Sequence, residues 1–439
     1  MDLHKERIGA GQKVGVINLG CARNLVDAQM LLGRLKRQGQ RIVAAPEAQT
    51  VIVNTCSFIE DARKESIDTI LDLIELKKEG KIKKVIVAGC LAQRYGKDLA
   101  KEFSAVDAFV GVPSLDRDNN PAQVQLTPKH FAYVKICESC FNVCSFCAIP
   151  KIKGKFISRT IESVVKEVKA LDAQGVKEIN IIGQDITAYG LDIYRQKSLA
   201  RLLKELAGVI KNIEWIRLLY AFPAHVSDEL IEVIAQEPRI CKYIDMPLQH
   251  ISDHILLEQN RNITTEQTIQ LIRKIRRAIP HGFVRTTFIT GLPGETREDF
   301  EELRAFVKDF RFERAGVFVY SKEEGTLAAG MKKQVPEKVK KARLDALMQD
   351  QKAVAMEIQQ SLVGRHLKVL IEEKENIPSL VHKQEPKASY KTYIGRSEYD
   401  APDVDGVVYV RSEVPLKAGD FIQVMITDAY EYDLAGVVE

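Results

Sequence analysis

Several features are scarce in this 439-residue sequence, and each absence excludes a class of protein. No apolar run approaches the roughly 18 residues that span a membrane, and the opening stretch MDLHKERIGAGQK has no apolar signal-peptide core. We therefore expect a cytoplasmic protein without membrane contact. The net charge of +4 is too small to indicate a polyanionic partner by itself. The rest of the composition is ordinary, with 45% hydrophobic and 28% charged residues, which excludes wholesale disorder.

The first hundred residues alternate between strand-like and helix-like patterns. Short Val/Ile-rich runs indicate strands, and apolar residues at helical spacing indicate helices between them: strands at 13–20, 50–55 and 83–89, helices at 22–38 and 58–79. This alternation predicts a doubly wound α/β domain with a parallel sheet. A stretch with three prolines and little periodicity, 112–129, is expected to be a linker, so we place the first domain at 1–125.

The remainder of the chain predicts two further domains. Six strand-like runs, most of them separated by helical stretches, lie at 131–136, 178–183, 215–220, 242–246, 284–289 and 316–320. Six parallel strands with crossover helices predict an open (β/α)6 partial barrel, which with a helical stretch at 336–362 gives a central domain over 126–362. In 363–439, strand candidates HLKVLIEE, GVVYVRS and DFIQVMITDAY are separated by Gly, Pro and Asp turns, which predicts a small β-barrel.

The eight cysteines are the first chemically informative residues. In a cytosolic protein, cysteines are more typical of metal ligands or redox groups than of disulfides. Cys140, Cys144 and Cys147 form a CxxxCxxC run, and three thiolates so close together can hold one iron–sulfur cluster. Such clusters usually take four thiolates, so one iron would stay available to another ligand. The alternative is structural zinc, whose ligands are usually paired CxxC or Cys/His motifs, and no His is near in sequence.

A second trio of cysteines is spread over the first domain. Cys21, Cys56 and Cys90 each come at the end of a predicted parallel strand. In open α/β sheets ligands bind at that edge, so the three thiols are expected to converge on a second metal site. The alternative is three buried cysteines that behave as small hydrophobic residues.

Two cysteines remain outside these trios. Cys137 could act as a fourth thiolate and close the cluster of the CxxxCxxC run. We expect instead that its side chain, at a strand end, points elsewhere, and that Cys241 belongs to the core.

The run CFNVCSFCAIPKIKGKFISR resembles the signature of radical S-adenosylmethionine (SAM) enzymes in its methylthiotransferase form. LGCARN, NTCSFI and AGCLAQRY resemble the three cysteine segments of that family's N-terminal domain, and GQDITAYG, YIDMPLQH, TTFITGLPGET and YSKEEGT are similar to its further motifs. The C-terminal segment resembles the family's TRAM domain. YIGRSEYDAPDVDGVVYV and ITDAYEYDLAG look like the branch that modifies a ribosomal protein. The sequence departs from the family pattern at Ser139, where glycine is usual, at Cys137, where a small residue is usual, and at Gln259, where methionine is usual.

This resemblance implies two [4Fe–4S] clusters with SAM as cofactors. Cys140, Cys144 and Cys147 would hold the cluster whose open iron chelates SAM, and SAM cleavage would give a 5′-deoxyadenosyl radical. The second cluster would hold or donate sulfur, and a second SAM would provide the methyl group. The implied product is an aspartate methylthiolated at its β-carbon, in the small-subunit protein at the decoding centre. The C–H bond of that carbon is one that a side-chain base cannot deprotonate. An electron donor such as a flavodoxin or ferredoxin is also implied.

Two loops are candidate cofactor contacts. The resemblance places such contacts at Gly183, Gln184 and Asp185, which by themselves would be an ordinary turn after a strand. Gly291, Pro293 and Gly294 follow another strand, where glycine permits close backbone approach to a ligand and a plain turn is the alternative.

Basic residues follow the CxxxCxxC run directly: Lys151, Lys153, Lys155 and Arg159. They could face an anionic substrate, and a solvated loop is an equally good interpretation.

The charge of the last domain bears on the partner. Residues 363–439 contain nine Lys and Arg against fourteen Asp and Glu, a net charge of −5. An RNA-binding domain should be electropositive, so the acidic barrel favours a basic ribosomal protein, with RNA contact secondary. Scattered acids that keep the surface soluble are the alternative. Two other functions stay open: a tRNA adenosine methylthiotransferase and a non-catalytic iron–sulfur electron carrier.

Overall fold

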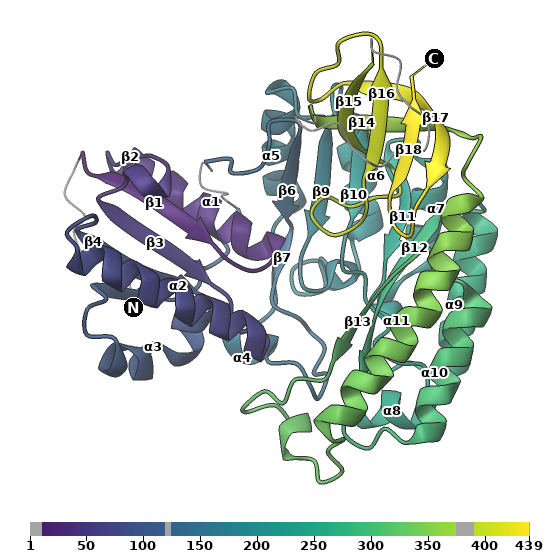
Figure 1. Cartoon of the computed structure of the whole chain (residues 1–439), viewed down its shortest axis with the longest axis horizontal. Helices are drawn as coiled ribbons and strands as arrows, with labels where there is room; N and C mark the ends of the chain where they lie inside the picture. Colours follow the sequence, from purple (N-terminus) through teal and green to yellow (C-terminus); the bar gives the residue numbers. More distant parts are fainter. Residues whose placement is uncertain (1–10, 119–123, 375–389, 439) are drawn as a thin grey trace.

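The computed structural model describes residues 11–118, 124–374 and 390–438. Figure 1 shows an N-terminal domain in purple and blue, a larger central domain in teal and green, and a yellow C-terminal barrel that sits against the central domain. The first ten residues of the opening stretch and residues 119–123 of the expected linker lie outside the described residues.

The N-terminal domain is the expected doubly wound parallel sheet. Its strand order is β2-β1-β3-β4-β5, and all its pairings are parallel. Helix α1 packs on one face through Leu31, Leu32 and Leu35, while α2 and α3 cover the other face. The elements are β1 (Lys13–Asn18), α1 (Ala22–Arg37), β2 (Arg41–Ile42), β3 (Thr50–Thr55), α2 (Glu60–Lys78), β4 (Lys84–Gly89), α3 (Cys90–Glu102) and β5 (Ala108–Val110).

The central domain contains a six-stranded, all-parallel open sheet in the order β13-β12-β11-β10-β9-β6. All six expected strands are present: β6 (Phe131–Lys135), β9 (Glu178–Ile182), β10 (Trp215–Leu218), β11 (Ile240–Asp245), β12 (Phe283–Thr290) and β13 (Arg314–Val319). A pair of two-residue strands, β7 (Cys137–Glu138) and β8 (Ile157–Ser158), flanks the CxxxCxxC loop. Within the described ranges, no helix is both long and apolar enough to cross a bilayer.

The longer helices of the central domain pack on the outer face of this sheet in one large hydrophobic core. They are α5 (Ile161–Ala173), α6 (Leu199–Val209), α7 (Asp228–Gln236), α9 (Thr265–Ala278), α10 (Arg297–Phe310) and α11 (Glu337–Gln360). The short helices α4 (Ile149–Lys153) and α8 (Asp253–Glu258) place Ile152 and Ile255 in two separate small clusters. Since each strand is followed by a crossover helix, the carboxyl ends of all six strands lie at the same end of the sheet.

The C-terminal segment forms the expected small barrel, closed in the order β14-β15-β16-β18-β17. Its strands are β14 (His366–Lys374), β15 (Lys391–Ser397), β16 (Val408–Ser412), β17 (Phe421–Ala429) and β18 (Leu434–Val437). The sequence analysis found β14, β16 and β17 but missed β15 and β18. Closure of the barrel pairs every one of these strands on both sides.

The barrel packs on the inner face of the central sheet through aromatic and buried ionic contacts. Trp215, the single tryptophan of the sequence, meets Phe421 edge to face at 4.7 Å between ring centroids. Glu178 of β9 is fully buried and accepts hydrogen bonds from Arg217 of β10 (2.8 Å) and Arg396 of β15 (2.7 Å). The central and C-terminal domains therefore share one core.

Candidate iron–sulfur site

The three N-terminal cysteines lie at the carboxyl ends of neighbouring strands. Cys21 is the N-cap of α1 after β1, Cys56 follows β3, and Cys90 is the first residue of α3 after β4. Because β1, β3 and β4 are adjacent in the sheet, the three thiols are brought to one edge. This is the edge at which ligands bind in such folds.

Close packing joins these three loops. Gly20 has φ +89°, and a Cβ there would come within 3.2 Å of the Cys56 Sγ, so the Cys21 loop lies directly against Cys56. The Asn24 side chain donates to the carbonyl oxygens of Leu19 and Thr55, both at 3.1 Å, and its Oδ1 lies 3.6 Å from the Cys90 Sγ. One amide thus ties all three cysteine-bearing segments together.

The three thiols have different electrostatic environments. Burial raises the pKa of Cys56, and raises that of Cys90 to about 12, with further contributions from the neighbouring thiolates. Burial also acts on Cys21, but the Arg23 guanidinium and the Asn24 N–H group outweigh it and lower the pKa of Cys21. Cys21 is therefore the thiol of this trio that most readily becomes a thiolate.

The trio of the CxxxCxxC run, Cys140, Cys144 and Cys147, lies in the loop between β7 and α4. The backbone N–H and side-chain amide of Asn142 both lie 3.3 Å from the Cys140 Sγ, and the Arg261 guanidinium lies 3.6 Å from the Cys144 Sγ. Burial raises the pKa of Cys140 to about 11 and that of Cys147 to about 12, and the neighbouring Cys144 adds to both shifts. Unligated, Cys140 and Cys147 stay protonated, and a positive centre is needed to hold them as thiolates.

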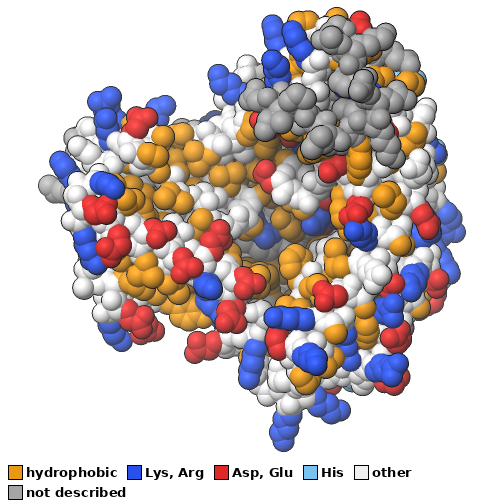
Figure 2. Space-filling view, in the orientation of Figure 1, with side chains coloured by type: hydrophobic (Ala, Val, Ile, Leu, Met, Phe, Trp, Pro, Cys, Tyr) orange, Lys and Arg blue, Asp and Glu red, His pale blue; other side chains and the backbone are white. Residues whose placement is uncertain are grey.

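The two trios adjoin one another across the domain boundary. Cys90 packs in a small buried cluster with Ala148 and Ile152, which follow Cys147 directly. Helix α3 contacts α4 there. In the same region, Figure 2 shows a hollow between the N-terminal domain and the rest of the molecule, with hydrophobic and charged side chains on its walls.

A buried ionic network lies beside this junction. Asp27 of α1 pairs with Lys135 and with Lys153 (2.8 Å), and Lys135 also pairs with Glu138 (2.6 Å). All four side chains are at most 6% exposed. The sequence suggested that Lys153 faces either an anionic substrate or solvent. Both interpretations are wrong for this residue, because the carboxylates of Asp27 and Glu138 neutralise Lys153 in the interior.

Arg159 is likewise buried, where it pairs with Glu167. Lys151 and Lys155 are exposed, and Lys151 donates to the Gly325 carbonyl oxygen. The basic run after the CxxxCxxC motif thus divides into two buried structural cations and two surface lysines.

Cys137 and Cys241 both lie in the core. Cys137 is fully buried, its Sγ is 3.5 Å from the Asp185 carbonyl oxygen, and burial raises its pKa well above the usual range. Cys241, in β11, is 1% exposed. Both cysteines are therefore buried, as expected for Cys241, and the role of Cys137 outside the cluster remains a prediction.

The loop of Gly183, Gln184 and Asp185 lies next to both trios. Arg23 donates to the Gly183 carbonyl oxygen at 3.0 Å, and Gln184 donates to Glu138 at 2.7 Å. Asp185 is fully buried: one carboxylate oxygen accepts from Thr187, and the other accepts from the Asn142 amide at 2.9 Å. Asp185 thus orients the residue that faces Cys140.

The turn of Gly291, Pro293 and Gly294 is built around a carboxylate and a helix. Glu295 accepts from the N–H groups of Gly291 (2.6 Å) and Leu292 (3.1 Å). Gly291 has φ +75°, and a Cβ there would lie 2.2 Å from the Lys340 Cγ of α11. The close approach that requires glycine at this position is that of α11, whereas a Cβ at Gly294 would meet only His254, at 3.9 Å.

Sequence analysis missed three residues of the site, namely Arg23, Asn142 and Arg261. Arg261 is 4% exposed, stacks on Phe222 at 4.2 Å and donates to the Pro247 carbonyl oxygen at 2.6 Å. The one available signal was position, because Arg23 and Asn142 each lie two residues from a trio cysteine.

The donor set fits clusters better than single metal ions. A zinc site needs all its ligands around one centre, whereas each thiolate of a cubane cluster binds a different iron and the ligands stand farther apart. With no histidine in either trio, six free cysteines fit two clusters of three thiolates each.

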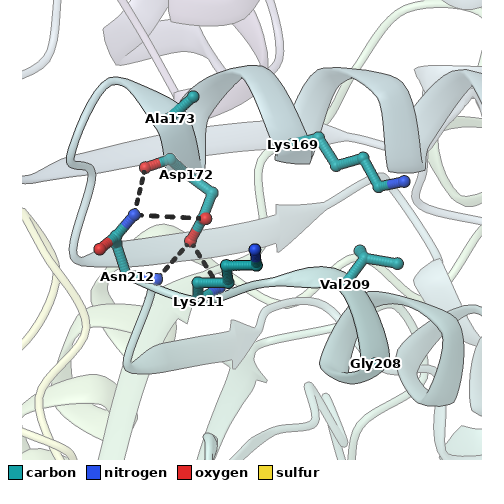
Figure 3. A pocket seen from close by; sticks show the side chains of 7 residues that line it. All are labelled: Lys169, Asp172, Ala173, Gly208, Val209, Lys211 and Asn212. Atoms are coloured by element: carbon teal, nitrogen blue, oxygen red, sulfur yellow. Dashed lines mark hydrogen bonds between the residues drawn. The ribbon is translucent and has the colours of Figure 1, made fainter.

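A separate surface hollow, of about 590 Å³, lies between the ends of α5 and α6. Figure 3 shows Asp172 at its wall, and this carboxylate accepts from the N–H groups of Lys211 (3.0 Å) and Asn212 (2.7 Å). Asp172 holds the loop after α6, and none of the predicted site residues lines the hollow.

Family models match three segments of the chain. The model described as "Radical SAM superfamily" matches residues 134–307, "Uncharacterized protein family UPF0004" matches 13–111, and "TRAM domain" matches 363–438. Each model covers the core of one of the domains described above.

Whole-chain relatives decide the family. The ribosomal protein uS12 methylthiotransferase RimO of Thermoanaerobacter sp. (strain X514) is 44% identical, over 97% of this chain and 99% of the relative. RimO of Caldanaerobacter subterraneus subsp. tengcongensis is 45% identical over the same shares, and RimO of Geobacter sulfurreducens is 43% identical over 98% and 99%. The chain belongs to the RimO family of radical SAM methylthiotransferases. Membership of the RimO family confirms the expected enzyme class, with SAM and [4Fe–4S] clusters as cofactors.

Solved structures confirm the fold of this RimO-family chain at low sequence identity. The radical SAM methyltransferase TsrM from Kitasatospora setae, bound to tryptophan and a SAM analogue, matches with a TM-score of 0.52 at 14% identity, over 84% of this chain and 79% of TsrM. A second TsrM structure, with cobalamin and a [4Fe–4S] cluster, matches with a TM-score of 0.51 at 15% identity, over 82% and 77%.

Proposed function

We propose that this protein methylthiolates the β-carbon of an aspartate in ribosomal protein uS12, in the cytoplasm. Its relatives are named for uS12 and cover nearly the whole of this chain. The observation that carries the proposal is the pair of cysteine trios on opposite sides of one domain junction, in contact through Cys90, Ala148 and Ile152. An electron carrier needs one such trio, whereas insertion of sulfur at a carbon radical needs a radical source and a sulfur site side by side.

The chain's own residues prepare both sites. Cys140, Cys144 and Cys147 would hold one cluster, and Cys21, Cys56 and Cys90 the other. When bound at Cys140, Cys144 and Cys147, a [4Fe–4S] cluster with SAM supplies a radical that removes hydrogen from an unactivated carbon. The Arg261 guanidinium and the Asn142 amide direct hydrogen-bond donors at Cys144 and Cys140. Donors at cluster sulfurs raise the reduction potential, so these two residues would favour electron uptake.

Apolar side chains around the CxxxCxxC loop suit a protein substrate. Val143 and Leu257 are 62% and 80% exposed and lie on adjoining segments, since the Asn260 amide donates to the Val143 carbonyl oxygen at 3.4 Å. Leu327 is 66% exposed, on the loop whose Ala328 N–H donates to the Ser145 carbonyl oxygen at 2.9 Å. Exposed apolar residues gathered at a site mouth are typical of protein-binding surfaces.

Mass spectrometry of uS12 tests the proposal directly. In a strain that lacks this gene, uS12 should lose the mass of one methylthio group, and the full-length gene should restore it. The matched control is complementation with Cys144→Ala, which should leave uS12 unmodified. If uS12 keeps its modification in the deletion strain while a hypermodified adenosine disappears from tRNA, the substrate assignment is wrong.

A further inference from the structure

We propose that Asp405 of the C-terminal barrel is a positioning residue for the Cys21 site, which it reaches through Arg285, Asp245, Tyr220 and Arg23. The inference rests on the proposed function, because it assigns the barrel a part in shaping the N-terminal cluster site in addition to any contact with substrate. The chain of contacts crosses all three domains and is argued step by step below.

The first step is the docking of the loop between β15 and β16 on the inner face of the central sheet. The Asp405 side chain is 4% exposed and accepts a hydrogen bond from the Tyr243 hydroxyl at 2.6 Å. Its other carboxylate oxygen lies 3.4 Å from the Arg285 Nε. Asp405 also accepts from the Ala401 N–H at 2.9 Å, which fixes the loop around it.

The second step runs within the central domain, from Arg285 to Tyr220. A terminal nitrogen of Arg285 donates to Asp245 Oδ1 at 2.8 Å. The second oxygen of Asp245 accepts from the backbone N–H of Tyr220 at 3.0 Å. Arg285 therefore stands between two carboxylates, one from the barrel and one at the carboxyl end of β11.

The third step uses an unusual backbone conformation. Tyr220 has φ +71°, in the left-handed region that is unfavourable for a bulky residue. Such a conformation persists only where its surroundings impose it, and the hydrogen bond from the Tyr220 N–H to Asp245 is one such constraint. The left-handed turn sets the direction in which the Tyr220 ring leaves the strand.

The last step crosses to the N-terminal domain. The Arg23 guanidinium lies over the Tyr220 ring, 4.1 Å from its centroid, and donates to the Gly183 carbonyl oxygen at 3.0 Å. Arg23 lies in the first turn of α1, two residues after Cys21, the N-cap of that helix. The Tyr220 ring and the Gly183 carbonyl thus fix the cation that faces the first thiolate of the N-terminal trio.

The test compares two aspartates of the same loop. Asp405→Asn keeps the size of the side chain but removes the charge that holds Arg285. The matched control is Asp403→Asn, because in the described contacts Asp403 bonds to Tyr133 (3.2 Å) and to neither Arg285 nor Asp245. Asparagine also tolerates the left-handed conformation of residue 403, which has φ +63°.

The first readout is spectroscopic and does not depend on activity. Both changes are made in a Cys144→Ala background of the full chain, so that the N-terminal cluster alone contributes to the electron paramagnetic resonance spectrum. Asp405→Asn should shift the spectrum and midpoint potential of that cluster, and Asp403→Asn should leave both unchanged. Hydrogen exchange of the iron-free protein should rise at residues 19–25 and 219–222 in the first variant only.

The second readout uses the enzyme with both trios intact. Asp405→Asn should lower methylthio product per 5′-deoxyadenosine formed by between about twofold and thirtyfold, the range for residues that couple separate sites. Asp405→Glu should restore part of this yield.

Identical spectra and exchange for Asp405→Asn and Asp403→Asn would overturn the inference. Failure of the proposed function would show differently, as a wild-type protein that makes no methylthiolated uS12 while the spectroscopic difference between the two variants persists.

Discussion

Ser139 precedes the first cysteine of the CxxxCxxC loop and has φ +68°. A side chain in this left-handed conformation costs roughly 1–2 kcal/mol, which is a physical reason for the glycine that the family usually has there. The Ser139 hydroxyl donates to the Gly154 carbonyl oxygen at 2.6 Å and offsets part of this cost. The bond also joins the two ends of the segment that carries Cys140, Cys144 and Cys147.

Substitution of Ser139 separates strain from hydrogen bonding. Ser139→Ala keeps the strained backbone and loses the hydroxyl, so the free energy of unfolding should fall by about 1 kcal/mol. Ser139→Gly loses the same bond but relieves the strain, and should be close to wild type. Urea denaturation of the two variants side by side measures the difference. Equal midpoints for both would show that residue 139 carries no strain.

Substitution of single cysteines should show which reaction step depends on each trio. Cys144→Ala removes a ligand of the predicted SAM-binding cluster and should abolish 5′-deoxyadenosine formation. Cys56→Ala should leave that cleavage intact and block sulfur insertion. Chromatography of 5′-deoxyadenosine together with mass spectrometry of uS12 measures both products. Equal loss of SAM cleavage in the two variants would contradict the assignment, and Cys241→Ala, outside both trios, is the control.

At the level of single residues, the sequence is most informative where spacing carries the information. Both cysteine trios could be proposed as ligand sets, and remain predictions, because strand ends and a CxxxCxxC loop fix their positions along the chain. Lys153 and Arg261 could not, because their partners Asp27 and Cys144 are more than a hundred residues away in sequence. The sequence alone does not show whether a lysine is buried or solvated, because this depends on partners that only the fold brings close.

At the scale of elements, one helix start links the N-terminal site to the central domain. Cys21, Arg23, Asn24 and Asp27 all lie in the first turns of α1. A thiolate at a helix N-terminus is favoured by the unpaired N–H groups and the helix dipole. Asp27, about one turn farther on, projects to the central domain and meets Lys135 and Lys153. A single helix thus sets both the ligand position and the domain contact.

Asp27 should be a strong stability determinant of this contact. Asp27→Asn leaves two buried ammonium groups with only Glu138 between them, and loss of one partner in such a network costs about 3–5 kcal/mol. The control is Asp98→Asn on α3, whose pair with Lys101 is exposed and contributes under about 1 kcal/mol. Thermal unfolding should show a large fall in midpoint for the first variant alone. Similar midpoints would mean that Asp27 adds nothing to the domain contact.

Elements buried on both faces were predictable, and short or edge elements were not. The run TVIVNT of β3 is buried along its whole length, so its continuous apolar pattern identified it. Strand β2 has two residues and lies at the sheet edge, and β18 has four, so neither has room for a periodic pattern. Strand β15 alternates weakly around Gly395, which lies against Val369 in the closed barrel.

At the scale of the whole molecule, ionic groups are buried between the central domain and the barrel. Glu178 separates the guanidinium groups of Arg217 and Arg396, and all three side chains are at most 2% exposed. Burial raises the pKa of Glu178, but the two arginines outweigh it and lower that pKa below its usual range. The carboxylate therefore stays charged inside the shared core, and removal of its charge would leave two cations facing each other.

Substitutions of two glutamates at the contact between the central domain and the barrel, here called the seam, should differ sharply in their effect on the free energy of unfolding. Glu178→Gln should lower the free energy of unfolding by about 3–5 kcal/mol, because it leaves buried guanidinium groups unpaired. Glu214→Gln breaks the pair with Lys368. The side chains of Glu214 and Lys368 are 42% and 40% exposed, so this change should lower the free energy of unfolding by under about 1 kcal/mol. Urea titrations followed by circular dichroism compare the two. A small effect of Glu178→Gln would show that water reaches the seam.

The domain limits at 1–125, 126–362 and 363–439 remain predictions, although the family models match segments inside each of them. Sequence patterns located the three domains because each has its own periodicity. They could not predict that the barrel docks on the inner face of the central sheet, since that contact pairs residues of two domains that lie far apart in the sequence.

The seam also contains a natural reporter. Trp215, the single indole in the chain, is 4% exposed and touches Phe421 across the boundary. Its emission wavelength is therefore a direct gauge of whether the barrel is seated, and no dye or engineered label is needed. Undocking would wet the indole and move its emission to the red while the remaining helices and strands stay folded, so a fluorimeter can follow this one motion in real time.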